Sequence, residues 1–358
     1  MKLKITSLVF ISLLFLFSAC SNTNFSEAEW EKETESVKTE DLYISHKSST
    51  TFFNPWIDMD KGFGDFLTWK FSESQVYTEE EKRFLPKVYT DAKQQLLDHP
   101  ENDFILWIGH GSFLIKTGNQ VWLLDPMFSE RALLPARLTP PAITAEEINT
   151  LFPELNVVIS HNHYDHLDEN SIKDLSENYV YYVPLGLKGT IQDWQPNTKI
   201  IEMDWWDKLK TADGYEIHCL PAQHWSNRVF DGRNSSLWAS FMIVSPESNI
   251  YFGGDSGYFM GYKEFGKKYP KIDYALIPTT AYHPRWFMHE AHMNIEESIQ
   301  AFQDLKADYF VPTQWGTFSL GNEPAGYPGL DLKRTIQAKQ LDQEKYLILD
   351  IGELYTMR

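Results

Sequence analysis

The chain has little of what several protein classes depend on. Its 358 residues include only two cysteines, Cys20 and Cys219, so no disulfide framework is expected. Basic residues are outnumbered, with 32 Lys and Arg against 50 Asp and Glu, and the formal net charge is −18 at pH 7. Because proteins hold nucleic acid mainly by neutralising phosphates with Lys and Arg, this balance argues against a nucleic-acid partner. The sequence also lacks internal repeats and low-complexity segments.

Apolar and aromatic residues, by contrast, are plentiful. The chain is 42% hydrophobic and 15% aromatic, which is enough to bury a core and excludes a disordered protein. Its length allows one large domain or two smaller ones. Cys219 lies in a strand-like run, and we interpret it as a small buried apolar side chain, not as a metal ligand.

The first twenty residues have the features of a lipoprotein signal peptide. Lys2 and Lys4 form a charged start, and residues 8–17 form an apolar run that is too short to span a membrane comfortably. The sequence Phe17-Ser18-Ala19-Cys20 resembles a bacterial lipobox, with Cys20 as the lipidated residue. An ordinary signal peptide is the alternative. We therefore expect an exported protein that is anchored to a membrane of the bacterial cell envelope through Cys20, with a mature charge of −20.

Composition divides the rest of the chain into a tether and a domain. Residues 21–50 are polar and rich in glutamate, which favours a solvated tether between the lipid and the domain. Aromatic residues are dense over 51–100, and we expect a packed N-terminal extension there, with a polar helix near 79–95. Residues 51–358 then form one domain that includes this extension.

The remainder of the domain contains many short apolar runs that predict strands, with helices between them. Strands are expected at 104–108, 112–116, 121–124, 156–159, 179–183, 199–202, 215–220, 237–244, 250–252, 274–277, 309–311 and 346–351. Asp168 is expected to cap a helix over 171–175, and Asn294, with Glu297 three residues later, a helix that ends near residue 305. The number of strands alone does not select a topology.

A cluster of metal-binding residue types follows the strand expected at 156–159. His161, His163, Asp165 and His166 fall within six positions, although the whole chain has only 11 histidines. A loop that leaves a strand can fold several side chains back onto one point, and imidazole together with carboxylate suits zinc, iron or manganese. A histidine-rich surface loop that binds nothing is the alternative.

The order His-x-His-x-Asp-His resembles the signature of the metallo-β-lactamase superfamily. The resemblance implies an α/β (α+β) fold of four layers, the αββα sandwich, in which two sheets pack face to face with helices outside. It also implies that His161 and His163 serve one metal, and that Asp165 and His166 serve a second metal beside it.

Two later residues would complete the metal centre. His224 follows the strand at 215–220 and is the natural third imidazole for the first metal. Asp255 follows the strand at 250–252 and two glycines, which permit a tight turn that points its carboxylate at both metals. Taken alone, His224 would be interpreted as a core histidine with its hydrogen bonds satisfied, but the motif that precedes it favours a ligand.

The position of the last superfamily ligand, a histidine, is occupied by Gln314. An amide oxygen is a neutral and weaker donor than an imidazole nitrogen. The second metal would keep Asp165, His166 and Asp255, with Gln314 as a weak fourth ligand. We therefore expect one or two zinc ions, with Mn²⁺ or Fe²⁺ as alternatives at the second site and with that site only partly occupied.

Longer motifs resemble the N-acylphosphatidylethanolamine-hydrolysing phospholipase D branch of the superfamily. The matching segments lie between residues 54 and 318 and include Trp107-Ile108-Gly109-His110-Gly111-Ser112, Asp125-Pro126-Met127-Phe128 and Ala281-Tyr282-His283-Pro284-Arg285-Trp286. The branch usually has glutamate where His283 stands, whereas His292 matches a family histidine near the substrate.

The resemblance implies a metal-dependent hydrolase, and most directly a phospholipase D-type phosphodiesterase acting on a membrane lipid. Two metals about 3.5–4 Å apart would hold a hydroxide at neutral pH, Asp165 would be a ligand and a candidate proton acceptor, and His292 would orient the phosphate or protonate the leaving group. We expect His110 to support the metal ligands from outside the coordination sphere and not to bind a metal itself. His283 and His289 stay unassigned, as potential substitutes for the missing imidazole.

Two other functions stay open at this point. The first is a hydrolase of a soluble phosphodiester, lactone or ester on the same fold. The second belongs to another class, a lipoprotein that binds metal or ligand without turnover because Gln314 replaces a ligand. An acidic chain does not obviously suit an anionic lipid, so a lipid hydrolase would need a locally basic or aromatic entrance.

Overall fold

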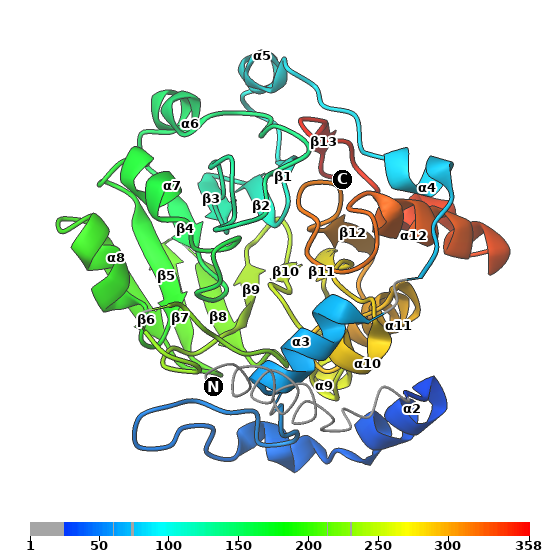
Figure 1. Cartoon of the computed structure of the whole chain (residues 1–358). Helices are drawn as coiled ribbons and strands as arrows, with labels where there is room; N and C mark the ends of the chain where they lie inside the picture. Colours follow the sequence, from blue (N-terminus) through cyan, green and yellow to red (C-terminus); the bar gives the residue numbers. More distant parts are fainter. Residues whose placement is uncertain (1–24, 60, 73–74, 213, 230) are drawn as a thin grey trace, which may run out of the picture.

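The computed structural model describes residues 25–59, 61–72, 75–212, 214–229 and 231–358, so the expected signal peptide and Cys20 lie outside the described residues. Two β-sheets form the centre of the molecule (Figure 1). The seven-stranded sheet has the order β13 (Leu354–Thr356), β1 (Phe104–Gly109), β2 (Ser112–Thr117), β3 (Gln120–Leu124), β4 (Asn156–Val158), β5 (Val180–Pro184), β6 (Lys199–Met203). The six-stranded sheet has the order β12 (Tyr309–Thr313), β11 (Tyr274–Pro278), β10 (Ile250–Phe252), β9 (Ser240–Val244), β8 (Tyr215–Leu220), β7 (Lys208–Ala212).

Both faces of the seven-stranded sheet are buried, and strand β1 shows how. Ile105 and Trp107 belong to the core cluster between the two sheets, whereas Leu106 and Ile108 belong to a cluster on the opposite face. Since successive side chains of a strand point to opposite faces, a strand covered on both sides needs a continuous apolar run. The sequence of β1, Phe-Ile-Leu-Trp-Ile-Gly, has that pattern.

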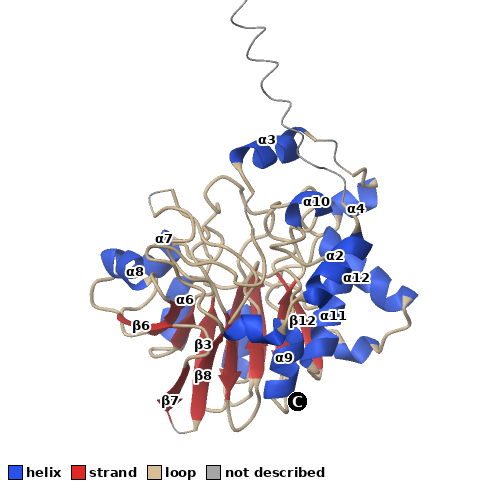
Figure 2. Ribbon diagram, turned by 90° about the horizontal axis from the view of Figure 1, so that it is seen from below, coloured by secondary structure: helices blue, strands red, loops and turns tan. Residues whose placement is uncertain are grey.

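Helices cover the outer face of each sheet (Figures 1 and 2). Against the seven-stranded sheet pack α5 (Ala92–Asp98), α6 (Ala145–Leu151), α7 (Glu169–Asp174) and α8 (Lys188–Trp194). Against the six-stranded sheet pack α9 (Gly261–Lys268), α11 (Ile295–Leu305) and α12 (Tyr327–Ala338). The arrangement confirms the four-layer αββα sandwich. Asp168 caps α7 and Asn294 caps α11, as the sequence predicts.

Two expectations about secondary structure are wrong. The helix expected at 79–95 is two short helices, α4 (Glu79–Arg83) and α5, because Pro86 between them cannot donate a backbone hydrogen bond and disfavours helical geometry in the residue before it. Residues 346–351 form isolated bridges, Phe310 with Tyr346 and Val88 with Ile351, and the last strand is β13 instead. Cys219 is fully buried in β8, as expected.

The described part of the expected tether packs on the domain instead of lying free in solvent. Helix α2 (Glu27–Ser36) begins at the cap residue Ser26, and a 3-10 helix follows at Thr39–Tyr43. Trp30 of α2 is only 4% exposed, and its Nε1 donates to Glu297 Oε1 of α11 at 2.8 Å. The glutamate-rich composition of this segment does not reveal these contacts, because only a few of its residues make them. No helix of the described residues has the length and hydropathy that a bilayer span requires.

Two short helices lie at the loop end of the sandwich. Helix α3 (Phe63–Phe71) stands beyond the ends of the strands in Figure 2, with α10 (Arg285–Met288) near it. The two helices are joined by the rings of Trp69 and Phe287, which stack with centroids 4.9 Å apart. Together they form part of the wall of the cavity described below.

Candidate metal centre

The residues of the sequence motif and their partners lie on loops that leave the carboxyl ends of strands. His161, His163, Asp165 and His166 follow β4 directly and precede α7. His224 follows β8, Asp255 follows β10, and Gln314 follows β12. Because these strands end at the same edge of the sandwich, residues distant in sequence meet at one place.

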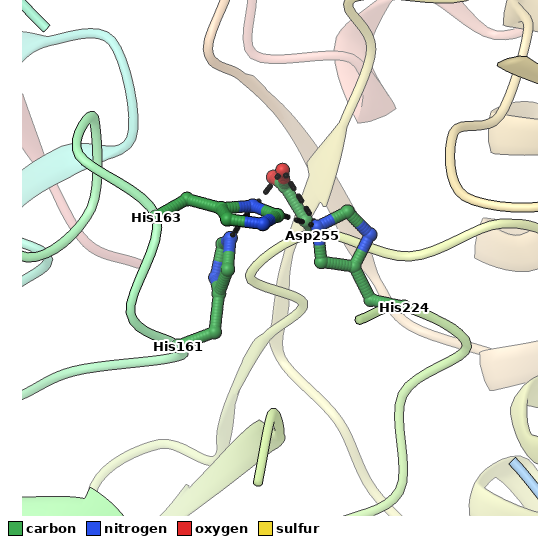
Figure 3. Close-up of side chains that lie close together, drawn as sticks. All are labelled: His161, His163, His224 and Asp255. Atoms are coloured by element: carbon green, nitrogen blue, oxygen red, sulfur yellow. Dashed lines mark hydrogen bonds and ion pairs between the residues drawn. The ribbon is translucent and has the colours of Figure 1, made fainter. Parts of the chain in front are cut away.

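The first group consists of His161, His163, His224 and Asp255 (Figure 3). Nε2 of His161 lies 2.8 Å from Nδ1 of His163, which lies 3.2 Å from Nε2 of His224. Oδ2 of Asp255 is 3.5 Å from His224 Nε2 and 3.8 Å from His161 Nε2. Three imidazoles and one carboxylate therefore point at a common centre.

Hydrogen bonds behind the imidazoles fix which nitrogen carries the proton. Nδ1 of His224 lies 3.2 Å from the carbonyl oxygen of Ala291, which can only accept, so Nδ1 donates and Nε2 keeps its lone pair. Nδ1 of His161 lies 2.9 Å from Ser160 Oγ, whose own proton goes to Asp125 at 2.6 Å, so Nε2 of His161 keeps its lone pair as well. The lone pairs of two imidazoles thus face the centre.

Burial keeps these imidazoles neutral. It lowers the pKa of His163 to about 4, and it lowers the pKa values of His161 and His224 well below the ordinary 6.5. Nε2 of His163 is buried without a hydrogen-bond partner among the described residues. Neutral imidazole nitrogens crowded around a carboxylate are a donor set that fits a zinc ion.

The second group consists of His110, Asp165 and His166. Oδ2 of Asp165 lies 2.9 Å from His110 Nε2 and 3.4 Å from His166 Nε2. His166 Nε2 also lies 3.3 Å from Oδ1 of Asp255, the oxygen that the first group leaves unused. Asp255 therefore presents one carboxylate oxygen to each group, which is the arrangement of a carboxylate that bridges two metals.

The carboxylates of the second group stay ionised. Burial works to raise the pKa values of Asp255 and Asp165, but the nearby imidazole of His166 outweighs it and holds both well below the ordinary 3.8. Burial works to lower the pKa of His166, yet the charges of Asp255 and Asp165 raise it well above 6.5. Two buried carboxylates thus attract positive charge to this point, and a divalent cation supplies more of it than a proton does.

A buried carboxylate behind the centre orients His166. Asp125 follows β3, and its Oδ2 accepts from Nδ1 of His166 at 2.6 Å, so Nε2 is the nitrogen that faces Asp165 and Asp255 and that a metal can bind in place of its proton. Asp125 also accepts from the backbone N–H of Ser160 at 2.7 Å. The sequence places Asp125 in a family motif but does not indicate that it orients His166, because this contact joins residues 41 positions apart.

Gly254 allows Asp255 to reach both groups. Its φ of +57° lies in the left-handed region, and a Cβ on Gly254 would come within 2.5 Å of the Cβ of Ser160. Only glycine therefore fits between the loop after β4 and the loop after β10. The sequence prediction of a tight turn at this glycine pair agrees with the geometry.

The remaining candidate residues lie at different distances from the centre. Gln314 is buried, and its Nε2 donates to the carbonyl oxygen of Gly254 at 2.9 Å. His292 has its ring centroid 5.3 Å from that of His224, and its Nδ1 is buried without a partner among the described residues. His283 Nδ1 bonds to Tyr77 Oη at 2.6 Å.

His289 packs against the N-terminal segment, with its ring centroid 4.6 Å from that of Trp30. Among the described residues, neither metal group includes His283, His289 or His292. The suggestion that His283 or His289 supplies the missing imidazole therefore finds no support in the structure. The third member of the second group is His110, which sequence reasoning placed behind the centre.

A cavity of about 320 Å³ opens onto both groups, since His163, Asp165 and Asp255 line it together with His292 and Gln314. Most of its other walls are apolar. They comprise Met59, Phe66, Trp69, Trp225, Ala281, Phe287, Met288, Ala291 and Leu320.

Comparisons with known proteins agree with this geometry. The Beta-lactamase superfamily domain family matches residues 121–315 of the chain. An N-acyl-phosphatidylethanolamine-hydrolyzing phospholipase D of Caenorhabditis elegans is 31% identical over 275 residues, which cover 70% of this chain and 75% of the nematode protein. An uncharacterised protein of Mycobacterium tuberculosis is 35% identical over 63% of this chain, and the chain spans 61% of the length of that relative.

A solved structure shares the fold. It is a metallo hydrolase of the archaeon Ignicoccus hospitalis, with a TM-score of 0.56 at 20% identity, and the match covers 72% of this chain and 99% of that chain. The chain therefore belongs to the metallo-β-lactamase superfamily, in the branch similar to N-acylphosphatidylethanolamine-hydrolysing phospholipase D.

Proposed function

We propose that the protein is a phospholipase D-type phosphodiesterase, which hydrolyses N-acylphosphatidylethanolamine-like lipids to phosphatidic acid and an N-acylethanolamine. The observation that carries the proposal is the cavity, in which apolar walls lead directly to both metal groups. A phosphodiester with long acyl chains needs both features, a charged reaction centre and an apolar channel beside it. The activity named for the nematode relative supports the same reaction.

The surface around the cavity also suits a membrane-embedded substrate. The six most exposed large hydrophobic side chains of the described residues are Val76 (91%), Phe71 (85%), Leu134 (77%), Val229 (67%), Leu138 (55%) and Leu133 (53%). We call these six residues the apolar rim. Exposed apolar side chains that gather in one region are typical of a surface that contacts a partner or a membrane.

Three segments carry the rim, and one contact links each of them to residues that line the cavity or lie close to these in sequence. Phe71 ends α3, the helix whose Phe66 and Trp69 line the cavity. The backbone N–H of Val229 donates to Tyr164 Oη, next to Asp165. The backbone N–H of Leu138 donates to the carbonyl oxygen of Thr317, three residues after Gln314. Phe71, Val229 and Leu138 are thus linked to segments at or near the cavity, and we propose that the apolar rim lies on the side from which a lipid would reach the centre.

Two cations, Lys70 and Arg233, lie over aromatic rings that line the cavity. Nζ of Lys70 lies 3.8 Å from the ring centroid of Trp69 on α3, and Arg233 lies over the ring of Trp225, which lines the cavity. These side chains can face an anionic headgroup region. Lys61 also lines the cavity, but its Nζ is held by Glu290 at 2.8 Å and by the carbonyl oxygen of Phe287 at 2.6 Å, so it braces α10.

His161, His163, His224 and Asp255 would hold one metal, and Asp165 and His166, with Asp255, a second. We propose zinc, with Mn²⁺ or Fe²⁺ as alternatives at the second site. The bound metals would lower the pKa of a coordinated water and offset negative charge on the phosphoryl oxygens.

The chain's own residues supply positioning and proton transfer. Asp165 lines the cavity and stays ionised, so it can accept a proton from the attacking water. Nδ1 of His292, which has no partner among the described residues, can donate to a phosphoryl or leaving oxygen. The apolar walls exclude bulk water from the acyl side of the substrate.

Membrane anchoring through lipidated Cys20 belongs to the same proposal. Residues 1–20 lie outside the described residues, so its support comes from the lipobox-like sequence. An anchor would hold the cavity near a substrate that resides in the same bilayer.

The test is hydrolysis by the zinc-loaded full-length protein in water enriched in ¹⁸O. Its substrates are vesicles of phosphatidylcholine that contain N-acylphosphatidylethanolamine, beside a panel of soluble phosphodiesters, lactones and esters. The expected products are phosphatidic acid that carries ¹⁸O and N-acylethanolamine that does not, because water attacks phosphorus and the ethanolamine oxygen leaves. A His161→Ala variant, which loses a ligand of the first group, should be inactive.

Each other outcome identifies an alternative. Turnover confined to a soluble substrate would replace the lipid assignment with the second candidate function. Release of diacylglycerol would place the cleavage at a different bond. A protein that binds metal and turns over nothing in the panel would favour the non-catalytic lipoprotein.

A further inference from the structure

The second metal group lacks the histidine expected at position 314, and the structure offers another imidazole at the same place. Gln314 is tied back by its side chain, since its Nε2 donates to the carbonyl oxygen of Gly254 at 2.9 Å. His110, on the turn between β1 and β2, is fully buried and belongs to the second group with Asp165 and His166. Residues 110 and 314 are direct neighbours, because the backbone N–H of Gln314 donates to the carbonyl oxygen of His110 at 3.0 Å.

The backbone of His110 is held firmly in an unusual conformation. Its φ is +51°, in the left-handed region that favours glycine. Its N–H donates to Thr317 Oγ1 at 2.8 Å, and its carbonyl oxygen also accepts from Trp107 Nε1 at 2.8 Å. Residues kept in such conformations by several bonds cluster at functional sites.

A hydrogen bond from Nδ1 of His110 orients the ring so that Nε2 faces the centre. Nδ1 lies 3.1 Å from the backbone carbonyl oxygen of Gln314, which can only accept, so Nδ1 carries a proton. Nε2 is then the nitrogen that faces the centre, 2.9 Å from Oδ2 of Asp165, and a metal bound between these two atoms would take the place of their hydrogen bond. Asp125 orients His166 in the same way, with Nδ1 donating to Asp125 and Nε2 facing the centre.

The spacing of the donor atoms matches one metal. In a tetrahedral site with bonds of about 2.0–2.1 Å, neighbouring ligand atoms lie about 3.3 Å apart. Oδ2 of Asp165 is 2.9 Å from His110 Nε2 and 3.4 Å from His166 Nε2, and His166 Nε2 is 3.3 Å from Asp255 Oδ1. These three distances, among two nitrogens and two oxygens, thus match the separation of neighbouring ligand atoms in a single coordination shell.

We propose that His110 is the fourth ligand of the second metal, and that it fills the place left by the exchange of histidine for Gln314. The imidazole comes from the end of β1 in place of the end of β12. Gln314 keeps an indirect part, since its backbone carbonyl orients His110 and its side-chain amide holds the turn that carries Asp255. The inference rests on the two-metal centre and is independent of which substrate the enzyme hydrolyses.

The test is metal titration, which needs no substrate. Protein stripped of metal is titrated with Zn²⁺ against a chromophoric chelator and with Co²⁺, whose visible absorption reports the coordination number. His110→Ala should raise the Kd of the second equivalent at least about tenfold, which is 1.4 kcal/mol, and leave the first within about twofold. Gln314→Ala and Gln314→His alone should each change the second Kd less than about threefold.

A rescue separates a ligand from a structural residue. In the double variant His110→Ala with Gln314→His, an imidazole returns to the second site from the neighbouring position, and the second Kd and the Co²⁺ spectrum should recover. Loss of the second site in Gln314→Ala, a tighter second site in Gln314→His, or an unchanged one in His110→Ala would each overturn the proposal. If His110→Ala does not fold, His110→Asn keeps a polar group against the Gln314 carbonyl and tests the same loss.

Discussion

Exchange of Asp125 for asparagine would test the hydrogen-bond logic of the centre by replacing one oxygen with an amide nitrogen. Oδ1 of Asp125 accepts from the backbone N–H of Ser160, and Oδ2 accepts from His166 Nδ1. A backbone N–H can only donate, so in Asp125→Asn the amide oxygen must stay at Ser160 and the amide NH₂ must face His166. Nδ1 of His166 then has to accept, and the ring proton moves to Nε2, the atom that faces Asp165 and Asp255.

The expected loss follows from that change of tautomer. A protonated Nε2 cannot bind metal, and removal of a carboxylate behind a metal-binding histidine typically costs 10- to 100-fold in metal affinity, which is about 1.4–2.7 kcal/mol. We expect a value near the upper end, because Asp125 and His166 are both fully buried and no water can replace the bond. The side-chain volume hardly changes, so the fold should persist.

The measurement is the Kd of the second metal equivalent in native and Asp125→Asn proteins. Asp168→Asn is the matched control, since Asp168 Oδ2 also accepts from a backbone N–H and two hydroxyls, those of Ser171 and Ser129, but touches no imidazole. The control should lose some thermal stability and keep its metal affinity. An unchanged second Kd in folded Asp125→Asn protein would refute the tautomer argument.

Three further outcomes are expected. Cys20→Ser should release the protein from the membrane fraction or block its maturation. If the Cys20→Ser protein stays in the membrane fraction after a carbonate wash, the anchor lies elsewhere. The double variant Val76→Asp with Leu134→Asp should lower the rate of lipid hydrolysis in vesicles at least about tenfold, because each aliphatic side chain buried in a membrane contributes about 1.5–3 kcal/mol. Hydrolysis of a monomeric short-chain lipid should not change. Equal losses on both substrates would contradict membrane contact. Burial raises the pKa of Glu323 from 4.5 to about 7, so the folded chain keeps a proton that the unfolded chain releases. Stability should therefore fall by up to about 3 kcal/mol as pH rises from about 4.5 to about 7, and Glu323→Gln should flatten that slope in thermal scans.

The four residues of the first group could be selected from the sequence because each one stands in a recognisable local pattern. His161 and His163 stand in a dense motif after an apolar run, and His224 and Asp255 each follow a strand that its own apolar pattern predicts. Once the strands are assigned to one sandwich, their carboxyl ends have to meet at one edge. Local pattern and global fold agree at these positions, and the four side chains lie together in the structure.

The roles of Asp125 and His110 were beyond prediction for a physical reason. Both residues have positive φ, +36° and +51°, in turns at strand ends, and no residue propensity predicts that conformation for Asp or His in a particular turn. Their partners, His166 and Asp165, lie 41 and 55 positions away. A motif can indicate that such residues belong to a family, but only the folded chain shows which nitrogen faces the metal.

The first described residues of the chain pack beside the segment that carries His292. The ring centroid of Phe25 lies 4.4 Å from that of His289, and Arg285 pairs with Glu27 at 2.8 Å while its Nη1 donates to the carbonyl oxygen of His292 at 3.2 Å. The five residues from Cys20 to Phe25 span at most about 17 Å. The chain can therefore place Cys20 no farther than that from Phe25. If Cys20 carries the proposed lipid, a link of five residues would hold the domain closer to the bilayer than a solvated tether over residues 21–50 would.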